Sequence, residues 1–351
     1  MRNESNIKGN LGVYRLAKTD IGEGTYSSVS LFMDVMESPS QPNLYAVKSI
    51  SLSNLRVSQV PVYGPEGLVD VCSGKFQLER EIAILDKLAS SKCKHLISIR
   101  EIVHEEELIH VVYPYRGYPV MSYSDNQRSY SACTRDRVYD YRTAELSDSD
   151  PVHLLTRDDA IECMRQLLSA VKVVHDNGIC HKDIKPENIL IMSPLSRWWS
   201  EGILQDSRQP SPIHLTLSDF NTAEFTRESG KIYDAQGTVL FSPPEAFTRA
   251  FKDSEDQAID GYARDMWSVG MVGYSLLIGT LPLKGKSPIE IQLELVGMAQ
   301  EAAQIPNIVL PSDLPSIETH PTPAIRTLVE SLLSIVPSKR PSAKQAIEII
   351  K

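Results

Sequence analysis

Carboxylate, lysine and amide side chains gather in one short segment of the sequence, residues 181–188 (His-Lys-Asp-Ile-Lys-Pro-Glu-Asn). The Asp183 carboxylate could orient an incoming hydroxyl group, and the Lys185 ammonium could neutralise charge that develops on a transferred phosphoryl group. Asn188 offers an amide oxygen to a metal ion, and Asp219, which follows the apolar segment 213–217, offers a carboxylate oxygen. These residue types at this spacing indicate phosphoryl transfer.

Two features of the N-terminal part could handle phosphate groups. Gly22 and Gly24 lie between two strand-like runs, and glycine lets the backbone approach a phosphate without obstruction by a Cβ atom. The segment is neither a Rossmann fingerprint nor a Walker A loop, because no helix follows it and no Gly-Lys-Ser or Gly-Lys-Thr ends it. Lys48 lies in the apolar run 45–50, where a buried cation needs a carboxylate or phosphate partner. Each feature alone is weak evidence.

In this order along the chain, the glycine-rich segment, Lys48, residues 181–188 and residues 219–221 (Asp-Phe-Asn) resemble the signature motifs of the eukaryotic protein kinase family. The resemblance extends from about residue 13 to the C-terminus. It implies that the chain uses ATP and Mg²⁺, with Asp183 as the catalytic base and Asn188 and Asp219 as metal ligands. It also implies that Lys48 contacts the α- and β-phosphates of ATP.

In the family this lysine pairs with a carboxylate on the following helix. The family's E-I-x-x-L pattern is matched by residues 81–85, so Glu81 is the expected partner of Lys48. Glu79 lies two residues away, about 200° around a helix, and is expected to face elsewhere.

The resemblance also implies which residues surround the adenine ring. The strand that ends at Val112 resembles the approach to the family's hinge, which makes Val112 the expected gatekeeper. The Tyr113 carbonyl and the Tyr115 amide are then the expected hydrogen-bonding partners of adenine. The other expected contacts of the nucleotide are Val29, Ala46 and Leu190 around the purine ring, and Ile21, Gly22 and Gly24 in the phosphate loop.

Motifs in the C-terminal half also match the family. Gly237-Thr238 and residues 243–245 (Pro-Pro-Glu) resemble the end of an activation segment, and residues 265–270 resemble the start of the buried central helix. Arg340 stands where the family has the arginine that pairs with the glutamate here numbered 245. Lys185 together with Thr238 is typical of serine/threonine kinases rather than tyrosine kinases.

Three positions depart from the family pattern. Ser27 replaces the third glycine of the phosphate loop, and Asn221 replaces the glycine of D-F-G. The second change is compatible with an active geometry, because asparagine is the non-glycine residue that most readily adopts a positive φ. Lys182 replaces the arginine that clamps a phosphate on the activation segment, and lysine lacks the planar fork for bidentate bonds. We therefore expect substantial basal activity without phosphorylation of the candidate sites Thr226, Ser229 and Tyr233, unless Arg227 or Lys231 forms a local clamp.

A narrower resemblance is to the calcium/calmodulin-dependent kinase kinase group and its fungal relatives. It rests on the loop before the helix of Glu81, on residues 81–85, and on residues 117–121 (Gly-Tyr-Pro-Val-Met). The substrates of that group are the activation loops of other kinases, so another kinase is an expected protein partner. The sequence ends at Lys351, soon after Arg340, so calmodulin control is not expected.

The elements that must position these residues form an α+β, two-lobed kinase fold. Alternating apolar runs between residues 13 and 50 predict a small antiparallel sheet, followed by an irregular loop at 55–74 and a single helix. Helical spacing after residue 156 predicts a larger, mainly helical lobe. The expected division is an N-terminal tail at 1–12, an N-lobe at 13–115 and a C-lobe at 116–351, with surface insertions around 117–151 and 193–212.

Composition limits the classes of partner. The chain has 351 residues, with 36 Lys and Arg against 45 Asp and Glu, so its formal net charge is −9. This balance gives no global positive field, and neither nucleic acid nor a membrane surface is expected as a partner. The cysteines are scattered, which suggests free thiols in the cytoplasm or nucleus. The sequence makes no prediction of oligomeric state.

Two other functions remain open at this point. A pseudokinase that binds nucleotide or acts as a scaffold is suggested by Lys182, Asn221 and the insertions, whereas the presence of every catalytic residue favours an active enzyme. A small-molecule kinase is disfavoured because residues 237–238 and 243–245 resemble a platform for a protein substrate.

Overall fold

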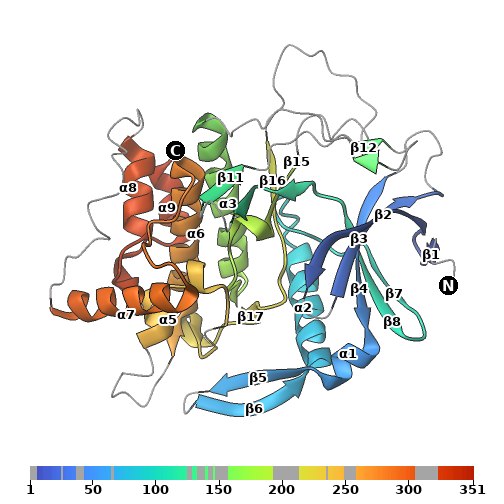
Figure 1. The fold of residues 1–351 in the computed structure, drawn as a ribbon, viewed down its shortest axis with the longest axis horizontal. Coiled ribbons are helices and arrows are strands. Elements are labelled where there is room, and N and C mark those ends of the chain that lie inside the picture. Colours follow the sequence, from blue (N-terminus) through green and yellow to red (C-terminus); the bar gives the residue numbers. More distant parts are fainter. Residues whose placement is uncertain are drawn as a thin grey trace.

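The computed structural model describes most of the chain. It covers residues 6–24, 27–36, 43–64, 67–124, 129–132, 139–140, 145–146, 157–192, 213–234, 236–248, 258–304 and 323–351. Within these ranges the chain forms a β-rich N-terminal part and a larger, mainly helical part (Figure 1). The predicted α+β, two-lobed fold is confirmed.

A six-stranded antiparallel sheet forms the N-terminal part. In spatial order its strands are β1 (Asn6–Lys8), β2 (Val13–Gly24), β3 (Ser27–Asp34), β4 (Leu44–Ser51), β8 (Leu108–Pro114) and β7 (Glu101–His104). Side chains alternate across the pleat of each strand, so the sheet has two faces. Val47 and Val112 are buried with Tyr14 on one face, whereas Val111 is buried with Leu78 on the other. Both faces of the central strands are therefore packed.

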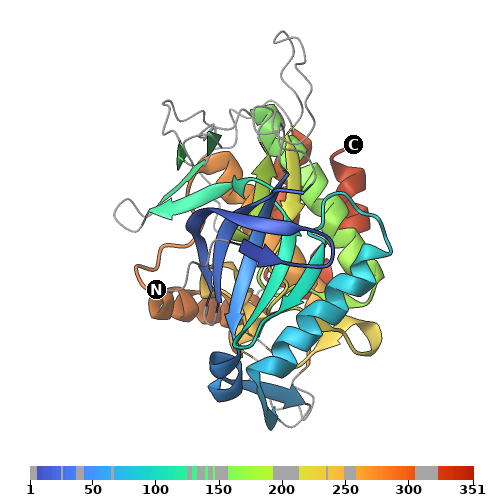
Figure 2. The same ribbon diagram turned by 90° about the vertical axis from the view of Figure 1, so that its right-hand side faces the viewer.

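Helix α2 (Gly74–Ala89) packs against this sheet, as the two ribbon views show (Figures 1 and 2). Its buried apolar residues, Leu78, Ile84, Leu85 and Leu88, follow the helical period. Glu81 lies on the same helix and is also buried. A carboxylate in this position needs a cationic partner, which the sheet provides.

The segment before α2 differs from its prediction. In place of an irregular loop at 55–74, the chain forms helix α1 (Leu52–Val57) and a hairpin of β5 (Gln59–Gly64) and β6 (Gly67–Ser73). Pro61 lies in a two-stranded hairpin, where every strand is an edge and a missing backbone donor is tolerated. The glycines and proline that suggested a loop are thus compatible with a short hairpin.

The expected N-terminal tail is also partly structured. Residues 6–8 form β1, which pairs with β2, and Ile7 is buried against the sheet. One buried isoleucine in a polar segment gave too short an apolar pattern to be recognised as a strand.

The helical part surrounds a large apolar core. The central helices α3 (Arg157–Asp176) and α6 (Gly261–Ile278) contribute buried residues such as Leu167 and Trp267. Asp260 caps α6, since its side chain accepts a hydrogen bond from the Ala263 amide. The other helices are α5 (Pro244–Thr248), α7 (Pro288–Gln304), α8 (Pro323–Leu332) and α9 (Ala343–Ile349), and α9 begins with the predicted capping box of Ser342 and Gln345.

Short elements connect the helices. The 3₁₀ turns are η1 (Pro186–Asn188), η2 (Glu228–Gly230), η3 (Val239–Phe241) and η6 (Pro337–Lys339). The antiparallel sheets are β14 (Ile179–Cys180) with β17 (Glu224–Phe225), β18 (Lys231–Ile232) with β19 (Ile259–Asp260), and β15 (Ile189–Met192) between β9 (Tyr118–Pro119) and β16 (His214–Leu217).

The first predicted insertion, 117–151, contains regular structure in its described parts. Besides β9 it holds two small hairpins, β10 (Met121–Ser124) with β11 (Ser129–Ala132) and β12 (Tyr139–Asp140) with β13 (Glu145–Leu146). The second predicted insertion, 193–212, lies outside the described residues.

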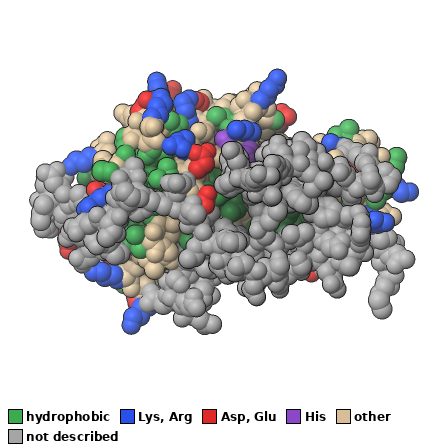
Figure 3. All heavy atoms as spheres, turned by 90° about the horizontal axis from the view of Figure 1, so that it is seen from above, with side chains coloured by type: hydrophobic (Ala, Val, Ile, Leu, Met, Phe, Trp, Pro, Cys, Tyr) green, Lys and Arg blue, Asp and Glu red, His purple; other side chains and the backbone are tan. Residues whose placement is uncertain are grey.

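None of the helices in the described ranges combines the length and apolar character needed to cross a bilayer. On the face in Figure 3, Lys and Arg side chains are scattered among acidic, apolar and other side chains over the part that is described.

A buried ion pair ties α5 to the end of the chain. The Arg340 guanidinium donates to both carboxylate oxygens of Glu245, at 2.5 and 2.8 Å. It also donates to the carbonyls of Ser334 and Ala263, at 2.8 and 3.0 Å, and lies over the Trp267 ring. This pair was predicted from the family resemblance, and the structure contains it.

Loss of this arginine should destabilise the fold, because the Glu245 carboxylate would be left buried without its partner. We expect Arg340→Met to lower the free energy of unfolding by about 3–5 kcal/mol. The matched control is Arg326→Met, which removes the partly exposed pair with Glu330 and should cost under about 1 kcal/mol. Equilibrium unfolding in urea measures both, and equal losses would contradict the structural role of the buried pair.

Candidate active site

A cavity of about 460 Å³ lies where the sheet meets the helical part. Strands β2, β3, β4 and β8 line one side, helix α2 contributes Glu81, and the segments after β14 and β16 line the other side. Of the residues expected to bind nucleotide or metal, the lining contains Ile21, Gly22, Val29, Ala46, Lys48, Tyr113, Tyr115, Asn188, Leu190 and Asp219. Gly24 pairs with Ser27 in the β2–β3 ladder.

Lys48 and Glu81 form an ion pair at the inner wall of this cavity. The Lys48 Nζ atom lies 3.1 and 3.0 Å from the two carboxylate oxygens of Glu81. Burial alone would lower the pKa of Lys48, but the negative charges of Glu81 and Asp219 outweigh it and raise this pKa. Glu79 instead pairs with exposed Lys75. The predicted choice of Glu81 over Glu79 is confirmed.

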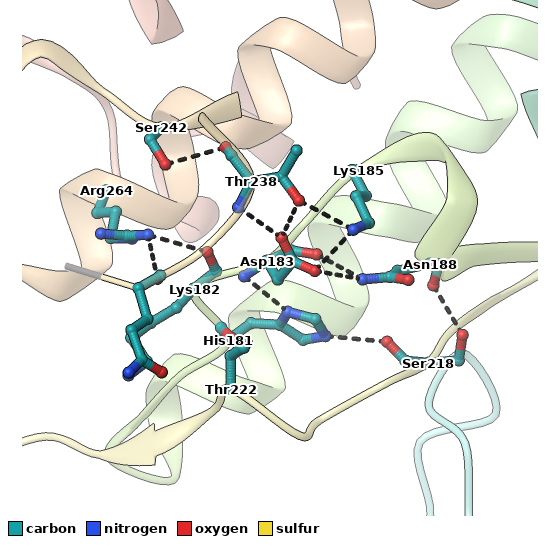
Figure 4. A network of polar contacts seen from close by, with 11 residues as sticks. His181, Lys182, Asp183, Lys185, Asn188, Ser218, Thr222, Thr238, Ser242 and Arg264 are labelled. Carbon is teal, nitrogen blue, oxygen red and sulfur yellow. Dashed lines mark hydrogen bonds and ion pairs between the residues drawn. The ribbon is translucent and has the colours of Figure 1, made fainter. Parts of the chain in front are cut away.

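The Asp183 carboxylate is held by three neighbours (Figure 4). One oxygen accepts from the Thr238 amide at 2.9 Å and from the Thr238 hydroxyl at 2.7 Å. The other lies 3.0 Å from Lys185 Nζ and accepts from Asn188 Nδ2 at 3.0 Å. Burial alone would raise the pKa of Asp183, but the Lys185 charge and the Thr238 hydrogen bonds lower it overall. The carboxylate therefore stays ionised and can accept a proton.

Asn188 and Asp219 supply oxygen atoms suited to a magnesium ion. Asn188 uses its side-chain nitrogen to donate to Asp183, which leaves its side-chain oxygen for a metal. Asp219 lines the same cavity and adopts a φ of 59°. The described residues contain no group of three or more His, Cys, Asp and Glu that could hold a metal by themselves. Two oxygen ligands fit Mg²⁺, which usually completes its octahedron with phosphate oxygens and water.

A carboxylate from α6 holds the loop that carries Asp183. Asp265 is fully buried and accepts from the His181 and Lys182 amides, both at 2.9 Å, and lies 3.0 Å from His175 Nε2. Burial alone would raise the pKa of Asp265, but the contact with His175 and the His181 bonds lower it. The sequence showed Asp265 as part of a motif without indicating this role.

Comparison with known proteins agrees with this geometry. The family model described as the protein kinase domain matches residues 16–349. The chain belongs to the eukaryotic serine/threonine protein kinase family.

Curated proteins that this kinase resembles include serine/threonine-protein kinases and calcium/calmodulin-dependent protein kinases. It is 27% identical over 277 residues to CBL-interacting protein kinase 16 of Oryza sativa subsp. japonica, covering 78% of this chain and 45% of that protein. It is 27% identical over 278 residues to calcium/calmodulin-dependent protein kinase type 1 of Caenorhabditis briggsae, covering 79% and 58%. It is 24% identical over 265 residues to serine/threonine-protein kinase atg1 of Schizosaccharomyces pombe, covering 75% and 29%. The chain thus matches 29–58% of the length of these relatives.

The predicted gatekeeper of this kinase is wrong by one residue. Val112 is buried on the outer face of the sheet with Val47 and does not line the cavity. Tyr113 lines it, and the strand register places Tyr113 opposite Ala46, whose side chain points the same way. Burial, together with the charges of Glu81 and Asp219, raises the pKa of Tyr113 well above its usual value, so its hydroxyl stays neutral. The gatekeeper position is therefore Tyr113.

The expected hinge contacts shift by the same one residue. The Tyr115 amide donates to the Leu44 carbonyl at 3.0 Å, so this group is used within the sheet and cannot serve adenine. Backbone groups alternate in direction along an extended strand, and the Tyr113 carbonyl accordingly faces β4 as well. The groups that point away from β4 are the Pro114 carbonyl and the Arg116 amide, and both residues line the cavity.

The backbone of the Asp-Phe-Asn segment shows why asparagine can stand at position 221. Positive φ occurs at Asp219 rather than at Asn221, so the absence of glycine at position 221 needs no left-handed backbone. The Asn221 carbonyl accepts a hydrogen bond from Gln77 Nε2 of α2 at 2.9 Å. Phe220 is fully buried, with its ring centroid 4.6 Å from that of His181. The segment is packed against both α2 and the loop of Asp183.

Replacing Tyr113, which lines the cavity, with a smaller residue should enlarge the cavity. We expect Tyr113→Ala to bind an adenine nucleotide with a benzyl group on N6 at least about tenfold more tightly than the wild type does, because the removed ring leaves apolar space. The matched control is Val112→Ala, whose side chain faces away from the cavity and should change this affinity less than about twofold. Calorimetric titration measures both affinities, and a gain in Val112→Ala alone would restore the original assignment.

Proposed function

We propose that this chain is an active serine/threonine kinase, which transfers the γ-phosphoryl group of Mg-ATP to Ser or Thr hydroxyls of protein substrates. The observation that carries the proposal is the joint placement of the Lys48–Glu81 pair and the ionised Asp183 carboxylate around one cavity. A protein that only bound nucleotide would have no need for Lys185 and Asn188 on the same carboxylate.

Each of these residues would have a separate role in phosphoryl transfer. Asp183 orients the substrate hydroxyl and accepts its proton, which its lowered pKa permits at neutral pH. Lys48, held by Glu81, positions the nucleotide phosphates, and Lys185 neutralises charge on the transferred group. When bound at Asn188 and Asp219, Mg²⁺ would neutralise phosphate charge. Transfer of this kind depends on position and charge, so no nucleophile on the protein is required.

The preference for Ser and Thr rests on the contact between Lys185 and Thr238. Lys185 Nζ lies 2.9 Å from the Thr238 hydroxyl, which itself donates to Asp183. This bridge joins the loop of Asp183 to the segment on which a protein substrate would lie. It supports the class of hydroxyl inferred from these two residues in the sequence.

We further propose that the activation loops of other kinases are among the protein substrates. The support is the sequence resemblance of residues 81–85 and 117–121 to the kinase kinase group. A panel of kinases with unphosphorylated activation loops, compared with unrelated Ser/Thr peptides, tests this narrower proposal separately from the activity itself.

The proposed roles predict large losses from single substitutions. Lys48→Met, Asp183→Asn and Asp219→Asn should each reduce phosphate transfer by at least about two orders of magnitude, the scale of losing a major electrostatic contact. The measurement is transfer of radiolabelled phosphate from Mg-ATP to proteins, with identification of the labelled amino acid. Asp176→Asn, at an exposed position, is the matched control and should retain full activity.

Thermal unfolding should show that the three variants remain folded. Near-native turnover of Asp183→Asn with intact Mg-ATP binding would remove Asp183 from its role. Absence of transfer in the wild type, with nucleotide binding retained, would instead support the pseudokinase function.

Lys185 should set the acid side of the pH profile. The pKa of Asp183 is lowered mainly by Lys185 against the effect of burial, so Lys185→Met should raise it. Asp183 acts only when ionised, and the variant should therefore lose kcat/KM at a higher pH than the wild type as the solution is acidified. Lys172→Met, which removes an exposed lysine paired with Asp176, is the control and should leave the profile in place. An unshifted acid limb in Lys185→Met would contradict this electrostatic role.

A further inference from the structure

Lys182, beside the catalytic base, is enclosed by two carboxylates. Its side chain is fully buried, and Nζ lies 2.6 Å from Asp234 Oδ2 and 3.0 Å from Glu224 Oε2. Glu224 and Asp234 are themselves largely buried, with exposed side-chain fractions of 17% and 8%. These two residues come from β17 and from the segment after β18, so one ammonium joins three stretches of chain. We name Lys182, Glu224 and Asp234 the lysine cluster.

Two of these stretches, those of Lys182 and Asp234, are also joined by an arginine of α6 that binds their backbone carbonyls (Figure 4). Arg264, which is fully buried on α6, donates to the Lys182 carbonyl at 3.1 Å and to the Gln236 carbonyl at 2.5 Å. The second carboxylate oxygen of Asp234 accepts from the Gln236 amide at 2.8 Å. One carboxylate oxygen of Asp234 therefore binds Lys182, and the other binds the Gln236 amide within the same segment.

This segment leads directly to the threonine that holds the catalytic base. Gly237 adopts a φ of 147°, and a Cβ atom there would lie 2.5 Å from both Arg264 Nη2 and the Lys182 carbonyl oxygen. Only glycine permits this close approach. Thr238 follows at once and bonds Asp183 through its amide and its hydroxyl. The position of Thr238 thus depends on the contacts of Asp234 and Gln236.

Charge makes the lysine cluster unsuited to receive a phosphate. One ammonium already faces two carboxylates, so the cluster alone carries an excess of one negative charge, and an added phosphoryl group would bring about 1.5–2 more. Of the candidate phosphorylation sites, Ser229 is exposed and Thr226 lies 3.0 Å from the Tyr262 hydroxyl. The Arg227 guanidinium lies over the Tyr233 ring. In the described part of the chain, the Lys182 ammonium is bound by Glu224 and Asp234 and not by any of these hydroxyls.

We propose that Asp234 is a positioning residue that, with Glu224, binds Lys182 and holds residues 234–238 ready for a protein substrate without phosphorylation. The proposal rests on the proposed kinase function and adds to it how the substrate platform is held. Asp234 acts through Lys182 and Gln236 and does not contact the reacting groups.

The first test separates positioning from overall stability. Asp234→Asn should raise KM for the protein substrate at least about tenfold and leave KM for ATP within about twofold, because the cavity is built from other residues. Asp234→Glu should recover part of the loss, since it keeps the charge. Glu228→Gln, at an exposed position on the same segment, is the matched control and should behave as the wild type does. Equal KM values for protein substrate in Asp234→Asn and wild type overturn the proposal.

A second variant removes the whole charge cluster. The triple substitution Lys182→Met, Glu224→Gln and Asp234→Asn removes every charge of the lysine cluster and leaves none of its ions unpaired, so its thermal stability should return toward that of the wild type. KM for the protein substrate should nevertheless stay raised, because the contacts that hold the segment are gone. Recovery of KM together with stability would show that the cluster serves charge balance alone and would overturn the proposal.

Two further measurements complete the design. Phosphatase-treated wild-type protein, checked by mass spectrometry, should keep its activity within about tenfold of the untreated protein, and a hundredfold loss would overturn the proposal. Amide hydrogen exchange should increase in residues 230–242 of Asp234→Asn and not in Glu228→Gln. Hydrogen exchange is measured without turnover. An inactive wild type would therefore contradict the proposed function, whereas the exchange data would still decide the role of Asp234.

Discussion

The geometry of the site depends first on one buried carboxylate, that of Asp265. It accepts two successive backbone amides, from His181 and Lys182, and so sets the direction of the loop before Asp183 reaches the cavity. Lys182 adopts a φ of 68°, a strained value for a residue with a side chain, and the bond from its amide to Asp265 helps to keep it there. This anchor fixes the backbone from which both the Lys182 side chain and the Asp183 carboxylate project.

Two kinds of connection then join this loop to the rest of the protein. Toward the cavity, Asp183 meets Lys185, Asn188 and Thr238, which are polar contacts that also carry chemistry. Away from the cavity, Lys182 meets carboxylates that are not in the cavity lining. Lys182 and Asp183 are adjacent in the loop, but their side chains point in different directions. Asp183 therefore faces the cavity, whereas Lys182 supports the neighbouring segment.

Much of this arrangement could be predicted from the sequence because the relevant residues occur in ordered motifs. The Lys48–Glu81 pair followed from the match of residues 81–85 to the family's E-I-x-x-L pattern, and helical geometry directed Glu79 elsewhere. The gatekeeper was placed one residue too early, because β8 carries apolar residues on both faces. Alternation within residues 108–114 therefore did not show which side chains face the cavity. The partners of Lys182 were also missed: Asp234 is one acidic residue in a segment without a period, and only the folded chain brings it to the lysine. The hairpin of β5 and β6 was mistaken for a loop because its glycines and proline outweighed a short alternating pattern.

The ion pair of Lys48 also has a bearing on covalent ligands. Acylating and sulfonylating reagents attack the neutral amine of a lysine, and the negative charges around Lys48 keep its side chain in the ammonium form. A lysine-directed inhibitor placed in this cavity would first have to separate Lys48 from Glu81 and remove a proton from it. Labelling of Lys48 by such a reagent should then increase when α2 moves away from β4, because this movement separates the amine from Glu81.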